Sequence, residues 1–155
     1  MKLNQPYYFN TNFGYQTNGR GRNFSIDTGK GFKNLGFNVG LSHIKIGDRH
    51  APSYSLTNSG KEEKGFNIGL HYHLNNFDIK FYYTYVDVNL ALLRSSVFHS
   101  GNAISRAISS EEPLFIRPFS FDINEPNQLV DHHLAKVNIN WWYNENDKLS
   151  FVFGR

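Results

Sequence analysis

The stretch GFNIGLHYHLNNFDIKFYYTYVDV, residues 65–88, decides the fold class of this chain. Its apolar side chains occupy every second position on both sides of the asparagine pair at 75–76, and most positions between them are polar or glycine. A period of two residues is typical of β-strands that have one apolar face and one polar face. An Asn-Asn pair tolerates the positive φ of a tight turn. The stretch therefore predicts a hairpin of two long strands.

The same alternation occurs elsewhere, so the hairpin belongs to a larger sheet. The further segments are 7–16, 24–28, 35–41, 133–143 and 149–153. Turn-forming sequences, such as NENDK at 144–148, lie between them. The sequence predicts an all-β fold, an antiparallel up-and-down meander of about seven long strands.

The lengths of the connections indicate which face of this sheet meets water. Short connections alternate with long ones: 30–34, 75–76 and 144–148 are short, 46–64 and 91–130 are long, and 18–22 is intermediate. Short turns at one end and long loops at the other are typical of outer-membrane barrels, whose strands need about 9 to 11 residues. Aromatic residues near the strand ends would form the girdles of such a barrel: Tyr7, Tyr15, Tyr72, Phe77, Tyr85, Trp141 and Tyr143. We expect an open segment of a large transmembrane β-barrel, with its apolar face toward lipid.

Composition excludes several classes of protein. Lysine and arginine total 16 against 13 acidic residues, a surplus too small for a nucleic-acid binder. The absence of cysteine excludes disulfides and thiolate metal sites. No window approaches the roughly 20 apolar residues of a membrane-spanning helix. The N-terminal sequence MKLNQPYYFNTN has no apolar core of a secretory signal, so we expect the chain as given to lack one.

The two long connections, 46–64 and 91–130, are the candidates for ligand binding, because functional groups gather on loops that rigid strands present. The longer one, at 91–130, has a length that in compact domains usually indicates a function. Within it, AISRAISS at 103–110 predicts one or two helical turns capped by Asn102 or Ser105. Four basic side chains of the 91–130 segment could bind an anionic chelate or a phosphate through charge-assisted hydrogen bonds. They are Arg94, His99, Arg106 and Arg117. The alternative is that they brace the loop or contact lipopolysaccharide.

His71 and His73 are weak candidates for a metal site, because both lie on one strand face and could reach one ion. Such a site needs a carboxylate or a further histidine, and Asp78 after the turn is the nearest along this hairpin. The alternative is that both histidines line the lumen. Serines and acidic residues show no nucleophile or carboxylate-pair arrangement, so we expect no catalysis and no cofactor.

Two long blocks resemble the barrel of TonB-dependent outer-membrane receptors of the Bacteroidetes type. The first is GDRHAPSYSLTNSGKEEKGFNIGLHYHLNNFDIKFYYTYVDV at 47–88, and the second is GNAISRAISSEEPLFIRPFSFDINEPNQLVDHHLAKVNINW at 101–141. The family patterns are matched by Ala51, Pro52, Tyr54, Leu56, Thr57, Asn58 and Gly60, and by Arg106, Ala107, Ile108, Pro113, Leu114, Phe115, Pro118, Phe119, Ser120, Ile123, Pro126, Gln128, Val130, His132, His133 and Lys136. With the similar hairpin GKGFKNLGFNVGLSHIKIGD, the resemblance covers about residues 23–155.

The resemblance implies active import of a scarce solute, such as a siderophore or other metal chelate, cobalamin or a glycan fragment. Import would use a barrel of about 22 strands that is filled by a plug and energised by TonB. Residues 1–155 would then be a partial barrel domain, without the signal peptide, TonB box, plug and remaining strands. The implied location is the outer membrane. The implied partners are its lipid and lipopolysaccharide, TonB through the missing N-terminal region, and a small-molecule or chelate ligand, with no nucleic acid.

Two alternatives come from other classes. One is a soluble antiparallel β-sheet module that binds glycans or polyanions through exposed aromatic side chains and basic turns. A weaker one is an enzyme with a histidine-bound metal. The identity of the transported ligand stays open, because the family uses one barrel for many solutes.

Overall fold

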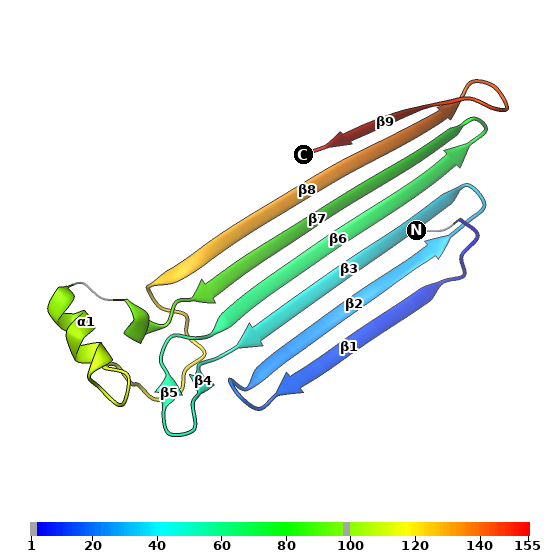
Figure 1. The fold of residues 1–155 in the computed structure, drawn as a ribbon. Helices are drawn as coiled ribbons and strands as arrows, with labels where there is room; N and C mark the ends of the chain where they lie inside the picture. Colours follow the sequence, from blue (N-terminus) through cyan, green and yellow to red (C-terminus); the bar gives the residue numbers. More distant parts are fainter. Residues whose placement is uncertain (1–2, 98–99) are drawn as a thin grey trace.

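The computed structural model describes residues 3–97 and 100–155 of the chain. Seven strands form one antiparallel sheet, whose order β1-β2-β3-β6-β7-β8-β9 follows the chain (Figure 1). The strands are β1 (Tyr8–Gln16), β2 (Gly21–Gly31), β3 (Leu35–Ile46), β6 (Lys61–Leu74), β7 (Phe77–Ala91), β8 (Asn127–Trp142) and β9 (Lys148–Gly154). β1 and β9 lie at opposite edges and do not pair with each other. The predicted open meander of about seven long strands is confirmed.

The remaining elements lie in the two long connections. β4 (Arg49–His50) and β5 (Ser55–Leu56) pair as a small second sheet in the segment predicted as a polar loop. The 3-10 helix η1 (Arg94–Ser96) and the helix α1 (Gly101–Ile108) follow β7. No helix in the described part of the chain is long and apolar enough to span a membrane.

The predicted helix forms, but its predicted cap is wrong. The N-cap of α1 is Ser100, whose Oγ accepts a hydrogen bond from the Ala103 N–H at 3.3 Å. Asn102 and Ser105 lie inside the helix, because it begins at Gly101. A serine with extended backbone just before the first turn is a favourable cap, since its oxygen accepts from an N–H that has no partner within the helix.

The connections are sorted between the two ends of the sheet, as the sequence predicts. Figure 1 shows β4, β5 and α1 together at one end, which we call the loop end, and the β1–β2 turn lies there too. The opposite turn end carries the short connections 32–34, 75–76 and 143–147, and the segment before β1 lies beside the first of them. β8 begins at Asn127, earlier than the sequence pattern predicts, so the last long connection is 92–126.

The strand register joins the apolar side chains into one continuous surface. Leu70 in β6 pairs with Phe37 in β3 and with Phe81 in β7. Phe81 pairs in turn with Val137 in β8. We call the surface on these four strands the apolar band; it consists of Leu35, Phe37, Val39, Leu41, Phe66, Ile68, Leu70, Tyr72, Leu74, Phe77, Ile79, Phe81, Tyr83, Tyr85, Ala135, Val137, Ile139 and Trp141.

Burial in this sheet is the reverse of that in a soluble domain. Among the described residues, Ala91 is the only buried hydrophobic side chain, whereas Asp48, Ser55, Thr57, Asn58, His71 and Asp78 are buried. In the apolar band, Leu70 is 39% exposed and Trp141 is 37% exposed. Soluble domains of this length bury most large apolar side chains in a core. The apolar face of this sheet is therefore uncovered, and the buried polar groups lie on the other face or at the loop end.

The polarity of the side chains differs between the two faces of the sheet, and it also changes along each face toward the loop end. Toward the loop end, the face that carries the apolar band becomes charged, with Lys64 two residues beyond Phe66 and Asp87 two residues beyond Tyr85. On the opposite face at the same level, Val86 and Val88 replace polar side chains. Because successive side chains alternate between faces, this exchange divides β7 into two zones of opposite pattern, whereas β6 carries the charged Glu63 on the opposite face at this level.

Candidate functional site

A cleft at the loop end has a volume of about 610 Å³. Segments far apart in the sequence form its walls: the end of β3, the loop after β5, η1 and the stretch before β8. Its lining residues are Asp48, Thr57, Asn58, Arg94, Phe115, Arg117, Pro118, Ser120, Asp122, Asn124 and Glu125. The lining is mostly polar, which suits a ligand that carries charged or hydrogen-bonding groups.

Asn58 joins the walls of this cleft. Its Nδ2 donates to the carbonyl oxygens of Leu92, Asn124 and Pro126 at 2.8, 2.9 and 2.8 Å. Its Oδ1 accepts from the Asn124 N–H at 2.9 Å. The residue is 4% exposed and has a φ of 61°, a conformation that asparagine tolerates better than most residues. One side chain therefore holds the loop after β5 against both ends of the 92–126 connection.

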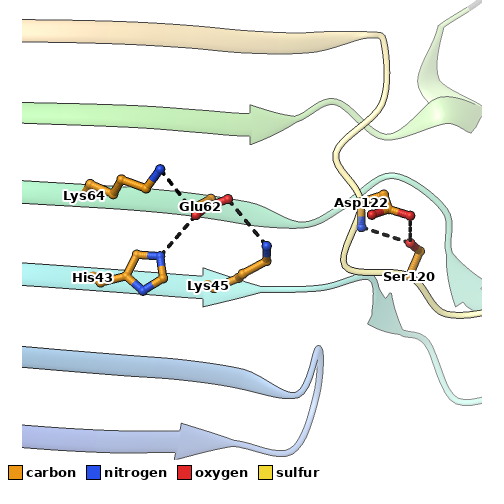
Figure 2. Close-up of polar contacts among 6 residues, drawn as sticks. All are labelled: His43, Lys45, Glu62, Lys64, Ser120 and Asp122. Atoms are coloured by element: carbon orange, nitrogen blue, oxygen red, sulfur yellow. Dashed lines mark hydrogen bonds and ion pairs between the residues drawn. The ribbon is translucent and has the colours of Figure 1, made fainter.

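Asp48 makes a second link of the same kind. Its carboxylate accepts from the Ser59 N–H at 3.0 Å and from the Ser120 N–H at 3.3 Å, and its own N–H donates to the Ser120 carbonyl at 2.9 Å. Ser120 is held further by Asp122, whose Oδ2 accepts from the Ser120 Oγ at 3.0 Å (Figure 2). Thr57 Oγ1 accepts from the Arg117 N–H at 2.8 Å. The cleft thus has a rigid hydrogen-bonded floor.

Two of the four predicted basic residues meet in this cleft. The guanidinium carbon of Arg117 lies 4.6 Å from the centre of the Phe115 ring, and that of Arg94 lies 5.7 Å from the same centre. Neither guanidinium forms a salt bridge with any residue that the structure describes. An aromatic face attracts a cation but leaves the N–H groups at its edge available to an anion. The arrangement is chemically suited to a carboxylate or phosphate group.

The other two predicted basic residues do not join them. Arg106 lies in the last turn of α1, is exposed, and is not among the lining residues of the cleft. His99 lies outside the described residues. The predicted set is therefore divided, and the structure brings together only Arg94 and Arg117.

His71 and His73 share a face of β6, as predicted, and both approach Asp78. His71 Nε2 lies 2.6 Å from Asp78 Oδ2, and His73 Nδ1 lies 3.7 Å from the same oxygen. Lys80 Nζ lies 3.5 Å from Asp78 Oδ1. Within residues 3–97 and 100–155, no three His, Asp or Glu side chains are arranged to hold a metal ion. The cluster is a polar network at the turn end of the face opposite the apolar band.

A third polar cluster surrounds Glu62 at the loop end of β6. His43 Nε2 lies 3.2 Å from its carboxylate, and the ammonium groups of Lys45 and Lys64 each lie 3.6 Å away (Figure 2). Glu62 lies four residues beyond Phe66, the last member of the apolar band on this strand. The hydrogen bond from His43 and the charges of the two lysines lower the pKa of Glu62 below its ordinary value of 4.5, against a smaller opposing effect of burial.

The lowered pKa gives a testable dependence of stability on pH. A carboxylate whose pKa falls on folding stabilises the fold above its unfolded pKa, and this contribution disappears as pH falls through the folded pKa. The free energy of unfolding in detergent should therefore decrease less between pH 6 and pH 3 in Glu62→Gln than in the parent chain. Denaturant titrations at each pH measure it. Parallel pH profiles for the two proteins would contradict the assignment.

Comparisons of the chain with protein-family models, with curated proteins and with solved structures found no match.

The sequence pattern did not identify the residues that build the cleft. Asp48, Thr57 and Asn58 were polar residues in a region predicted as a loop, and polar loop residues are usually solvated. Their burial depends on the 92–126 connection folding back over them. The available local signal was the TNSG sequence at 57–60, since asparagine, serine and glycine are turn-forming residues and asparagine tolerates positive φ.

Proposed function

We propose that the chain forms part of the wall of an outer-membrane transport barrel of the TonB-dependent receptor kind, and that the complete barrel imports a solute rather than catalysing a reaction. The observation that carries the proposal is the uncovered apolar band, which lies on one face of a sheet whose buried side chains are largely polar. In a barrel embedded in lipid, apolar side chains face outward and polar side chains face the lumen.

The dimensions of the apolar band support this proposal. From Phe66 to Leu74 the band extends along β6 for eight residue steps, or about 27 Å at the rise of a β-strand. Strands tilted by about 40°, as in known barrels, would give a height of about 21 Å before the aromatic side chains are added. This is close to the roughly 25 Å of the apolar belt of outer-membrane barrels. The charged zone beyond Phe66 would then lie outside the hydrocarbon.

Aromatic side chains at the turn end support it further. Phe77 and Trp141 stack with ring centres 5.8 Å apart, and Trp141 contacts Tyr143 at 6.1 Å. Amphipathic rings at one level of a lipid-facing surface are typical of the boundary between hydrocarbon and headgroups. These three aromatic side chains lie at the turn end of the apolar band, which is the position expected for an aromatic girdle.

The solute would meet the wall at the loop-end cleft. Arg94 and Arg117, which flank Phe115, would bind an anionic part of the ligand, and the hydrogen bonds of Asn58 and Asp48 would keep the cleft open. Bidentate hydrogen bonds from guanidinium to carboxylate or phosphate are among the stronger polar contacts in proteins.

This ligand site can be tested with small anions as probes. Citrate and inorganic phosphate should bind the detergent-folded chain, and Arg94→Ala with Arg117→Ala should weaken binding by about tenfold or more, since hydrogen bonds to charged groups contribute about 1.5 to 3 kcal/mol. Arg106→Ala is the control, because it removes one positive charge from the neighbouring helix without touching the cleft; the single variants Arg94→Ala and Arg117→Ala each match it in charge. Isothermal titration gives the affinities. Equal affinities for all three proteins would rule out the cleft as the anion site.

Whether the apolar band faces lipid is tested by asking if the chain needs detergent or lipid in order to fold. We expect the chain to acquire its β-sheet circular dichroism spectrum in detergent or lipid and to aggregate in plain buffer, because an open apolar sheet would otherwise associate through its face and edges. In cells, an antibody against residues 108–130 should detect the protein in the outer-membrane fraction. Cooperative unfolding of a monomer in plain buffer would contradict the proposal and favour the soluble glycan- or polyanion-binding module.

A further inference from the structure

The face of the sheet that carries the apolar band continues, at the loop end, into a group of basic side chains. The strand register places Arg22 of β2 beside Lys45 of β3, and His43 of β3 beside Lys64 of β6. Because paired residues share a face, all four lie on the same side of the sheet as the apolar band. We call Arg22, His43, Lys45 and Lys64 the basic patch.

Positive charge exceeds negative charge in the basic patch. Glu62 contacts three of the four members, at 3.2 to 3.6 Å, and is the only acidic residue among the described residues that forms a salt bridge with them. Lys45 and Lys64 therefore share one carboxylate, and Arg22, the third permanent cation of the basic patch, forms no salt bridge with the described residues. The side chains of Lys45 and Lys64 are 42% and 61% exposed, so their ammonium groups keep donors for a further anion.

The excess of positive charge is confined to one part of the loop end. On the same face and at the same level, β7 and β8 carry Asp87 and Asp131, which pair in the register. Asp87 also pairs with Lys64 in the register, so the acidic side chains over β7 and β8 begin directly beside the basic patch. The excess of positive charge is therefore centred on β2 and β3, which carry Arg22 and Lys45. An anion that approaches this face would be attracted most strongly to the side of the basic patch that lies over β2 and β3.

The basic patch directly adjoins the apolar band. His43 lies two residues beyond Leu41, and Lys64 lies two residues beyond Phe66, a distance of about 7 Å along each strand. If the apolar band contacts lipid tails, as the proposed function holds, the side chains just beyond it contact the headgroup layer. A soluble anion would need no such neighbour, whereas a lipid places its phosphate at this height.

We propose that the basic patch binds the phosphate of an outer-leaflet lipid that carries a phosphomonoester headgroup, with Lys45 and Lys64 as the main ligands. The inference rests on the proposed function, since it takes the apolar band as the lipid-facing surface. A phosphomonoester carries close to two negative charges near pH 7. This matches the excess of positive charge in the basic patch, where Glu62 offsets one of the three permanent cations. Glu62 positions the two lysines, and the tails of the same lipid lie against the apolar band.

Lipid titrations of the folded chain test this site. The chain in neutral detergent micelles is titrated with phosphatidic acid, which has a phosphomonoester headgroup, and separately with phosphatidylcholine, and the complexes are measured by native mass spectrometry. We expect phosphatidic acid to bind more tightly, and Lys45→Gln with Lys64→Gln to weaken that binding by about 30-fold, at about 1 kcal/mol for each lysine near an anionic headgroup.

The matched control is Lys61→Gln with Lys136→Gln, which removes the same charge from the opposite face of β6 and β8. This control should bind phosphatidic acid like the parent chain. The site would be overturned if both double variants lost the same affinity for phosphatidic acid, or if the parent chain bound the two lipids equally well. Displacement of phosphatidic acid by inorganic phosphate at matched ionic strength would overturn the lipid assignment. A chain that is folded and monomeric without detergent would instead refute the proposed function, so the two failures are distinguishable.

Discussion

Asn58→Ala is expected to lower the free energy of unfolding by about 3 kcal/mol, because it removes buried hydrogen bonds that have no solvent replacement. The Leu92 and Asn124 carbonyls lose the Nδ2 donor, and the Asn124 N–H loses its acceptor. The Pro126 carbonyl keeps a second donor, the Leu92 N–H at 2.9 Å, and so contributes less to the loss. Denaturant unfolding in detergent measures the change, and the 92–126 connection should become sensitive to protease.

Two further variants separate the causes of this loss. Asn58→Gly removes the same hydrogen bonds but accepts the φ of 61° without strain, so it should be less destabilised than Asn58→Ala by about 1 kcal/mol. Asn124→Ala is the control, because the side chain of Asn124 forms no hydrogen bond with the described residues. Unfolding energies of Asn58→Ala and Asn124→Ala that agree within about 0.5 kcal/mol would show that Asn58 does not hold the loop end together.

Leu70→Arg should destabilise the sheet in lipid vesicles by about 2 to 4 kcal/mol, the range for arginine at the middle of the lipid-facing surface of a barrel. Leu70 is the central member of the apolar band on β6, midway between Phe66 and Leu74. A charged side chain at this level must leave its favoured solvation by water. Urea titrations of the vesicle-inserted chain give the energies.

Tyr82→Arg provides a matched control on the opposite face. Tyr82 is 41% exposed, close to the 39% of Leu70, and it pairs with Gly69, the neighbour of Leu70. In a barrel its arginine would face the lumen, so the destabilisation should be well under half of that for Leu70→Arg. Equal effects, or a larger effect for Tyr82→Arg, would contradict the orientation of the sheet.

The sequence predicted the strands well because each one has a clear period of two. Alternation from Phe66 to Leu74 is visible without any partner strand, and it determines both the strand and its faces. The start of β8 was placed too late, since the sequence from Asn127 to His132 does not alternate. There the register with β7 continues the strand, and register depends on a partner that local sequence does not reveal.

The candidate site was predicted only in part, because it is built by contacts between distant segments. Arg94 and Arg117 were grouped with Arg106 by charge and proximity along the chain, but only the first two flank Phe115. The position of Arg106 follows from the helix that carries it. Asn58 is linked to residues 66 and 68 positions away, and no local pattern predicts which loop asparagine makes such bonds.

The orientation of the sheet in lipid is the central claim, and single-cysteine labelling along β7 tests it most directly. The chain contains no cysteine, so each introduced thiol is unique. Six variants in proteoliposomes would be treated with a water-soluble maleimide and, in parallel, labelled with a fluorophore that brominated lipid tails quench. The substituted positions are Ile79, Lys80, Phe81, Tyr82, Tyr83 and Thr84.

We expect a period of two in both signals. Thiols at the odd-numbered positions should resist the maleimide, and their fluorophores should be quenched by brominated lipid, because these positions belong to the apolar band. Thiols at the even-numbered positions should react and stay unquenched. Reaction at all six positions without quenching, or the reverse alternation, would show that the apolar band does not face lipid.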